Sequence, residues 1–219
     1  MLIKTATENK DPSSLAAKLR RRRFSLFLSL LSKVEKPISI LDVGGTQRFW
    51  EVMNFSAVDD IHFILLNVTE PPVSLPNFSS VVGDARNLLF PDRSFDIVFS
   101  NSVIEHLNRY EDQIRMAQEV RRVGKRYFVQ TPNKYFPLEP HFIFPFFQFL
   151  PVEVRIWLLR HFDLGRFNRV SDYQKAKSIV EGIRLLGKNE LLRLFPDANF
   201  FEEKISGITK SFVAYGGWE

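Results

Sequence analysis

Apolar runs of strand length alternate with polar or helical stretches along most of the chain. Five such runs cover residues 38–43, 61–68, 78–83, 95–101 and 126–133. Continuous apolar runs of this length are typical of strands that are buried on both faces. Helical or turn segments separate them, and strands separated in this way usually pair in parallel. The pattern therefore predicts an α/β fold with a mostly parallel sheet.

The later part of the chain breaks this rhythm and then resumes it. Residues 134–186 hold a stretch rich in proline and phenylalanine, followed by two helical segments. After them, residues 187–195 are predicted to form a helix, and residues 199–208 and 210–216 are predicted to form two strands. A connection of about fifty residues is too long for an ordinary loop. We therefore predict an inserted cap over 134–186 within a single domain that spans 13–219.

The N-terminal region carries a concentrated positive charge. Residues 1–12 are predicted to be a disordered tail, and the helix predicted over 13–33 contains a basic run from Lys18 to Phe24. Two interpretations of this run remain open. It is either a solvated basic turn that leads into a packing helix, or a surface that contacts anionic lipid or nucleic-acid phosphates.

Composition narrows the class of protein. The chain has 219 residues, of which 45% are hydrophobic, a formal net charge of +5 and no cysteine. Its apolar content suffices for one core, and the lack of cysteine excludes disulfides, thiolate metal sites and cysteine nucleophiles. No apolar run approaches the ~20 residues of a membrane-spanning helix, and the N-terminus lacks the apolar region of a secretory signal. We expect a cytoplasmic protein, with peripheral membrane contact left open.

Phenylalanine is unusually frequent. The chain has 22 phenylalanines, and the stretch from Thr131 to Pro151 is especially rich in them. One interpretation is an apolar pocket or membrane-facing lip that admits an apolar or lipid-like ligand. The other is a satellite core packed on Trp157, Leu158 and Leu159, or a dimer interface. The prolines indicate a rigid loop in either case.

Polar and glycine residues follow the first four predicted strands. They are Asp42, Gly44 and Gly45 after the first strand, Asn67 and Glu70 after the second, Asp84 and Ala85 after the third, and Asn101, Ser102, Glu105 and His106 after the fourth. Ligands of an open parallel sheet bind at the carboxyl ends of its strands. Glycines let a ligand approach the backbone, and an acid or amide about 20 residues after a glycine turn suits ribose hydroxyls. These residues predict a ligand site at this edge.

This constellation resembles the class I S-adenosylmethionine-dependent methyltransferases. The segment "ILDVGGT" stands where that family has its acidic, glycine-rich turn, and "FPDRSFDIVFSNSVIEHL" is similar to the type-11 group of small-molecule methyltransferases. The similarity covers residues 37–133 and 187–216. It implies a Rossmann-like, mostly parallel seven-stranded sheet with helices on both faces, a closing antiparallel hairpin and an aromatic-rich insert after strand five.

The resemblance also implies roles for single residues. Asp42, Gly44 and Gly45 would face the methionine part of S-adenosylmethionine, Asn67 or else Glu70 would hold its ribose, Asp84 beside Ala85 would accept from the adenine amino group, and Asn101 with Ser102 would line the methionine end. Thr46 and Arg48 stand where the family has further glycines, and Asn67 replaces the usual acid. An amide lacks the charge-assisted strength of a carboxylate.

Methyl transfer depends mainly on holding an acceptor in line with the sulfonium methyl group. O-methylation is favoured, and His106 and His141 are the candidate bases for a hydroxyl acceptor, with Glu105 and Glu139 as partners. Structural roles for both histidines stay open. The four side chains are also ligand types for a divalent ion, but Ser102 replaces the first acid of the E-x-x-E-H pattern of some metal-dependent O-methyltransferases, so no metal is expected.

Two other functions stay open at this point. One is a non-catalytic binding or scaffold protein, which the altered glycine turn supports. The other is a nucleic-acid methyltransferase, which is disfavoured because "TPNKY" stands where such enzymes carry D/N-P-P-Y. The expected partner is an apolar or lipid-linked small-molecule acceptor, not a nucleic acid, with a homodimer as a further option.

Overall fold

Seven strands form one sheet in the order β3-β2-β1-β4-β5-β9-β8. In the computed structural model, which describes residues 15–218, these strands are β1 (Ile38–Val43), β2 (Ile61–Asn67), β3 (Phe78–Val82), β4 (Ile97–Asn101), β5 (Tyr127–Pro132), β8 (Asn199–Ile205) and β9 (Ile208–Gly216). All pairs from β3 to β5 are parallel, whereas β9 runs antiparallel to both β5 and β8. The predicted mostly parallel sheet with a closing antiparallel hairpin is confirmed.

The strand order reverses between β1 and β4, and the register brings their ends level. β2 and β3 extend the sheet on one side of β1, and β4 and β5 extend it on the other. Asp42 lies opposite Leu65 of β2 and Phe99 of β4, and the N–H of Gly44 donates to the carbonyl of Leu66 at 2.7 Å. Such a reversal point is where open α/β sheets bind ligands.

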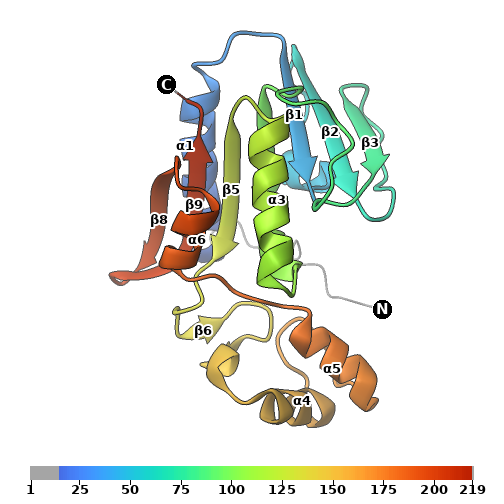
Figure 1. Ribbon diagram of the computed structural model, residues 1–219, viewed down its shortest axis with the longest axis vertical. Helices are drawn as coiled ribbons and strands as arrows, with labels where there is room; N and C mark the ends of the chain where they lie inside the picture. The colour runs from blue at the N-terminus through green and yellow to red at the C-terminus, as the bar shows by residue number, and fades with distance from the viewer. Residues whose placement is uncertain (1–14, 219) are drawn as a thin grey trace.

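Helices cover both faces of the sheet (Figure 1). α3 (Tyr110–Val123) and α6 (Lys188–Leu194) pack on one face, and α1 (Leu15–Leu31) and α2 (Gln47–Val52) pack on the other. A short 3-10 turn, η2 (Ile104–His106), follows β4. No helix among the described residues is both long enough and apolar enough to cross a bilayer.

An aromatic core lies between the sheet and the helices α1 and α2. Trp50 is fully buried at its centre. Its ring contacts those of Phe24, Phe27, Phe49, Phe55, Phe63 and Phe99. A large share of the unusual phenylalanine content therefore serves this core and not a ligand surface.

The basic run lies inside α1 and not in a turn before it. Arg23 points inward with a side chain that is 13% exposed, and its Nη1 lies 3.2 Å from Oε2 of the buried Glu203 in β8. Lys18 and Arg22 are exposed. The expectation of a solvated basic turn is wrong, because the helix continues through the run and pairs one of its arginines with a buried carboxylate. The tail predicted over 1–12 lies outside the described residues.

The segment between β5 and α6 forms a cap at the end of the sheet to which the parallel strands point (Figure 1). In chain order it contains β6 (Leu138–Glu139), β7 (Phe144–Pro145), the 3-10 turn η3 (Phe147–Phe149), α4 (Val152–His161) and α5 (Tyr173–Glu181). The chain enters and leaves the cap at one place, because the N–H of Lys134 donates to the carbonyl of Leu186 at 3.0 Å. The cap therefore sits directly beyond the strand ends.

The cap has a hydrophobic core of its own. Phe142 and Phe147 are 2% and 1% exposed, stack with ring centroids 4.1 Å apart, and share this core with Ile156 and Leu159. Its exposed aromatic residues are Tyr135, Phe146, Phe149, Trp157 and Phe162. The satellite-core interpretation is confirmed for Phe142 and Phe147, and a ligand- or membrane-facing role of the exposed rings stays a prediction. Trp157, which the satellite-core interpretation placed inside, lies on the surface.

Substitution of Phe27 tests how α1 packs on the sheet. Its ring is fully buried, with centroids 5.9, 5.1 and 5.3 Å from those of Trp50, Phe99 and Phe128. We predict that Phe27→Ala lowers the free energy of unfolding by about 3–5 kcal/mol, measured by urea denaturation. The control Phe162→Ala removes a ring that is 51% exposed and should change it by less than about 1 kcal/mol. Equal losses in the two variants would contradict this packing.

Candidate active site

The turn after β1 consists of glycines because side chains have no room there. Gly44 has a φ of +76°, in the left-handed region that favours glycine. A Cβ added at Gly44 would come within 2.5 Å of the side chain of Val103, and one added at Gly45 would overlap the carboxylate of Asp42. Thr46 precedes α2 without a capping hydrogen bond from its hydroxyl. The turn therefore presents backbone at the strand end.

The carboxylate of Asp42 supports this turn from inside the protein. The residue is 1% exposed, and its Oδ2 accepts a hydrogen bond from Nε1–H of Trp50 at 2.8 Å. Burial raises the pKa of Asp42 to about 7, although the hydrogen bond from Trp50 acts in the opposite direction. The structure thus directs Asp42 toward α2, and the backbone of Gly44 is what lies exposed at the edge.

Asn67 at the end of β2 fixes the same turn. Its Nδ2 donates to the carbonyl of Gly45 at 2.7 Å, whereas its Oδ1 receives no hydrogen bond from any described residue. Glu70 is exposed, and its Oε1 accepts from Oγ of Ser80 at 3.2 Å. Of the two ribose candidates, Asn67 is the one in contact with the glycine turn.

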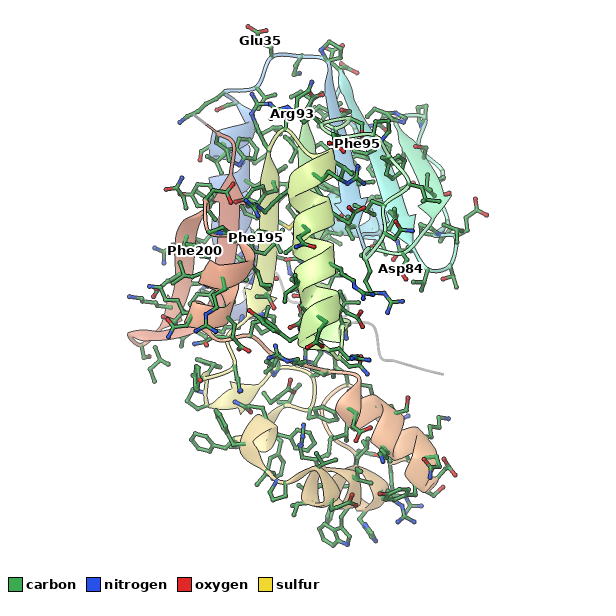
Figure 2. The ribbon with its side chains drawn as sticks, in the orientation of Figure 1. Glu35, Asp84, Arg93, Phe95, Phe195 and Phe200 are labelled. Carbon is green, nitrogen blue, oxygen red and sulfur yellow. The ribbon has the colours of Figure 1, made fainter. Side chains whose placement is uncertain are left out.

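Asp84 lies in the turn after β3 (Figure 2), and its carboxylate pairs with Arg86. Both of its oxygens lie 3.0 Å from Nε of Arg86, and Oδ2 lies 2.6 Å from Nη2. This guanidinium lowers the pKa of the Asp84 carboxyl. Arg86 also reaches Asp112 of α3 at 3.3 Å, and Ala85 packs against the core beneath α3. An adenine amino group would share Asp84 with Arg86.

Asn101 and Ser102 end β4 in different ways. The half-buried side chain of Asn101 has no hydrogen bond to another described residue and lines a small cavity of about 10 Å³ together with Arg20 and Phe49. Ser102 has a φ of +59°, and its Oγ donates to Oε1 of Gln130 at 2.8 Å, which ties β4 to β5. A cavity of this size holds about one water, so the methionine end of the cofactor needs the neighbouring side chains to move.

The polar groups at this edge fit a nucleoside that carries an amino acid. Oδ1 of Asn67 and the amide of Asn101 are hydrogen-bonding groups without partners among the described residues. Half-buried amides of this kind gain from a ligand that satisfies them. Between them lies the exposed backbone of the glycine turn. These residues could hold the ribose and the methionine part of S-adenosylmethionine.

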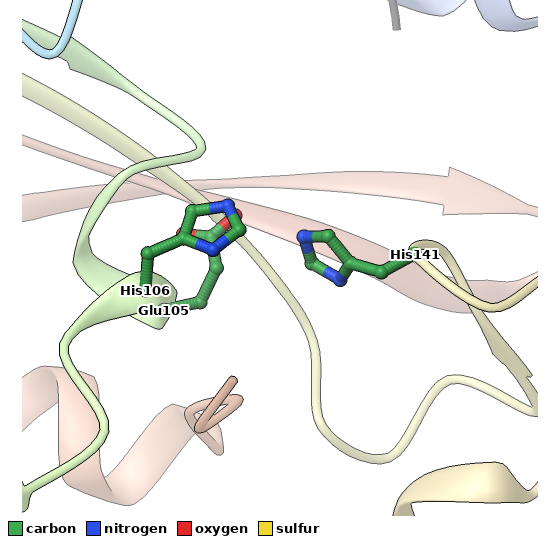
Figure 3. A group of neighbouring side chains, drawn as sticks. All are labelled: Glu105, His106 and His141. Carbon is green, nitrogen blue, oxygen red and sulfur yellow. The ribbon is translucent and has the colours of Figure 1, made fainter. Parts of the chain in front are cut away.

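The structure brings the two predicted histidines together (Figure 3). The rings of His106 and His141 meet edge to face with centroids 5.0 Å apart. Nδ1 of the buried His141 lies 2.8 Å from Oε1 of Glu139. Glu105 beside them is fully buried, with Oε2 accepting from Oγ1 of Thr131 at 3.1 Å and Oε1 without a hydrogen-bond partner.

The electrostatics of this cluster keep His106 uncharged. Burial, together with the nearby His141 and Arg166, lowers the pKa of His106 to about 4. Burial also raises the pKa of Glu105 above its usual value. The imidazole of His106 is therefore neutral at pH 7 and can accept a proton or ligate a cation. One face of His106 is packed against the cluster, but part of the residue is exposed, so solvent reaches the group from that side.

Several residues of the site were not predicted from the sequence. Arg86, Gln130, Thr131 and Arg166 contact or influence the predicted residues. Arg86 follows Asp84 by two positions, a spacing that allowed an ion pair to be foreseen. Arg166 lies in the cap and acts across a tertiary contact, for which the sequence carries no local signal.

Comparison with known proteins shows what this arrangement is similar to. A family described as "Methyltransferase domain" matches residues 51–127, about a third of the chain. A SAM-dependent methyltransferase from Aquifex aeolicus is 12% identical with a TM-score of 0.51, over 94% of this chain and 97% of that one. One from Methanosarcina mazei is 13% identical with a TM-score of 0.53, over 85% and 95%. The chain therefore has the fold of these SAM-dependent methyltransferases, and its residues 51–127 are similar to the methyltransferase-domain family.

Another solved structure of the same fold contains ligands. It is the 1,6-didemethyltoxoflavin-N1-methyltransferase of Burkholderia thailandensis with bound 1,6-didemethyltoxoflavin and S-adenosylhomocysteine, 12% identical with a TM-score of 0.53 over 90% of this chain and 76% of that one. The methyltransferase match of this chain begins at residue 51 and so leaves out the turn at Gly44 and Gly45. That boundary agrees with the departure of this turn from the family pattern.

Two curated relatives come from Mycobacterium tuberculosis, and both are named only as uncharacterized proteins. Each is 36% identical to this chain over 70 residues, which is 32% of this chain. The chain spans about a quarter (23%) of the length of these relatives. The comparisons thus establish the fold and a similarity of residues 51–127 to methyltransferase domains.

The buried carboxylate of Asp42 predicts a pH-dependent stability. Because its folded-state pKa of about 7 lies above the usual 3.8, its contribution is fully present below about pH 4 and is lost as the pH rises through 7. Between these limits we predict that the wild-type chain loses roughly 3–4 kcal/mol of unfolding free energy relative to Asp42→Asn, at 1.36 kcal/mol per pKa unit. Denaturant unfolding at several pH values measures this. The same pH dependence in both proteins would contradict it.

Proposed function

We propose that this protein transfers a methyl group from S-adenosylmethionine to a hydroxyl of an apolar or lipid-linked small molecule. The observation that carries the proposal is the edge formed by β1, β2 and β4. There the exposed backbone at Gly44 lies beside Asn67 and Asn101, whose side chains offer unused hydrogen-bonding groups. The class I fold and the methyltransferase-domain match support the same function.

Single side chains take distinct parts in holding the cofactor. Oδ1 of Asn67 is suited to accept from a ribose hydroxyl, and Asp84 to accept from the adenine amino group after Arg86 has shifted. Arg20 lines the cavity beside Asn101 and has no ion pair with a described residue, so it is suited to the carboxylate of the methionine part. The hydroxyl of Ser102 is already engaged by Gln130 and positions the backbone.

The bound cofactor would supply an electrophilic methyl group on a positively charged sulfur. The chain must then orient an acceptor oxygen toward that methyl carbon and take up the proton that the hydroxyl loses. Glu139 holds Nδ1 of His141, which leaves Nε2 as the free nitrogen of the ring. Nε2 of His141 and the neutral His106 are the two groups in this cluster that could accept the proton.

A cavity of about 180 Å³ inside the cap is suited to the acceptor. Its apolar walls are Phe142, Phe147, Val180, Ile183 and Leu185, and its polar lining is Lys134, Glu139, Gln148, Arg155 and Arg184. Glu139 lines this cavity and bonds His141, so the cavity borders the histidine cluster. Two unpaired polar atoms, Oε1 of Gln148 and Nε of Arg155, are buried within the residues that line it. Apolar walls together with these unpaired polar atoms favour an acceptor that is mostly apolar and carries one polar or anionic group.

A non-catalytic binding protein is the second candidate, and one observation favours it. Arg86 occupies both oxygens of Asp84, and the cavity beside Asn101 has room for about one water. If these contacts persist in solution, the cofactor has no place to bind. Binding of the demethylated cofactor separates the two functions.

Calorimetric titration with S-adenosylhomocysteine tests the proposed function. We predict that the wild-type chain binds it and that Asn67→Ala and Asn101→Ala each bind about tenfold more weakly, because each loses a hydrogen bond of about 1.4 kcal/mol. Asn168→Ala, an exposed asparagine of the cap, is the matched control and should bind like the wild type. Absence of binding to a folded wild-type chain would favour the non-catalytic alternative.

We further propose that the exposed aromatic rings of the cap contact a lipid surface from which a lipid-linked acceptor is taken. Phe149 stacks with Tyr135 at 6.1 Å, and Trp157 contacts Phe162 at 5.8 Å between ring centroids. These four rings are each about half exposed. Aromatic rings of this kind favour the boundary between lipid and water.

Co-sedimentation with vesicles that contain anionic phospholipid tests this contact. We predict that Phe149→Asp and Trp157→Asp each weaken pelleting by at least about tenfold, because each loses the burial of an aromatic ring, about 1.5–3 kcal/mol. Leu89→Asp changes an 87%-exposed residue outside the cap and is the matched control. Unchanged pelleting would contradict lipid contact, and loss of a dimer in the same variants would assign these rings to an interface between two chains.

A further inference from the structure

Three ligand-type side chains converge from separate parts of the fold (Figure 3). Glu105 and His106 lie on η2 after β4, and His141 lies in the cap between β6 and β7. One ligand atom from each of the three lies within 4.8 Å of the others. Ligand atoms of a tetrahedral zinc site lie about 3.3–3.4 Å apart, as follows from Zn–N distances of ≈ 2.0–2.1 Å. The side chains would have to move closer together around a bound ion.

The hydrogen bonding of His141 prepares it to bind a cation. Its Nδ1 lies 2.8 Å from Oε1 of Glu139, while Oε2 of Glu139 accepts from the backbone N–H groups of His141 and Phe142, each at 2.7 Å. Glu139 therefore holds the proton on Nδ1 and leaves Nε2 with a free lone pair. A histidine held by a carboxylate in this way is the usual support of a metal ligand.

Glu105 supplies the second, independent observation. The residue is fully buried, and its Oε1 has no hydrogen-bond partner, while Oε2 is held by Thr131. Burying a carboxylate oxygen without a partner is costly. A cation bound beside His106 and His141 would satisfy this oxygen.

The charges around the cluster have both signs. The carboxylates of Glu105 and Glu139 face it, and the guanidinium of Arg166 acts on both. Arg23 also acts on Glu105, and Arg155 on Glu139. A cation therefore has to be held by the ligand geometry of the cluster and not by its net charge. The exposed position of His106 gives an ion a path from solvent.

We propose that Glu105, His106 and His141 bind one divalent cation of the zinc class. Two imidazoles and one carboxylate are a ligand set that suits Zn²⁺ and Co²⁺ better than Mg²⁺ or Ca²⁺. Three protein ligands leave a coordination position open. The expectation of no metal followed from Ser102 in place of the first acid of the E-x-x-E-H pattern, whereas the structure brings Glu105, His106 and His141 together without that acid.

Cation binding would change the chemistry available at the proposed site. A hydroxyl that occupies the open position loses its proton more readily, because the cation stabilises the oxyanion. In that case the histidines act as ligands and not as bases. This consequence rests on the proposed methyl transfer, whereas cation binding itself does not.

Titration of the tag-free, metal-stripped full chain with Co²⁺ tests the proposal. We predict that one equivalent binds, that it gives visible absorption bands, and that added Zn²⁺ displaces it. His106→Ala and His141→Ala should each bind at least about tenfold more weakly. His161→Ala removes an exposed histidine of the cap and should leave binding unchanged.

Two comparisons make the outcome decisive. His106→Ala changes an exposed residue, so it keeps the test valid even if His141→Ala unfolds the cap. Binding of S-adenosylhomocysteine on the same samples reports separately on the proposed function. Absence of Co²⁺ binding to the folded wild-type chain would overturn the proposal, as would equal weakening by His106→Ala and His161→Ala.

Discussion

A buried carboxylate beneath a glycine turn determines the geometry of the candidate site. Asp42 lies against Gly45 and accepts from Trp50, and Asn67 donates to the carbonyl of the same glycine. The turn is therefore fixed by two strands and one helix at once. Because Trp50 is also the centre of the aromatic core, the packing of α1 and α2 and the shape of the strand-end edge depend on the same contacts.

The sheet and the cap contribute different chemistry to one place. The strand ends offer backbone and amide groups, which suit a cofactor that must be bound in a fixed position. The cap offers a cavity with apolar and polar walls, and it offers His141, which meets His106 from the sheet side. The sheet and the cap meet at two places. One is the point where the N–H of Lys134 donates to the carbonyl of Leu186, and the other is the contact between His106 and His141.

Local patterns predicted the sheet well, because a continuous apolar run identifies a buried strand wherever it occurs. The first strand has the predicted bounds, Ile38–Val43. The contacts that determine the site were harder to predict from the sequence, because they join residues that lie far apart in the chain. Arg23 reaches Glu203, and the orientation of Asp42 toward Trp50 required the tertiary packing of α2. The aromatic stretch was ambiguous, since composition cannot say which rings of a compact cap point inward.

The account depends most on cofactor binding at the carboxyl ends of β1, β2 and β4. Hydrogen–deuterium exchange followed by mass spectrometry, with and without S-adenosylhomocysteine, measures this directly along the chain. We expect slower exchange in peptides that cover the glycine turn at Gly44, the end of β2 at Asn67 and the end of β4 at Asn101, because ligand contacts protect the backbone there. Protection confined to the cap, or no protection at saturating ligand, would contradict the account.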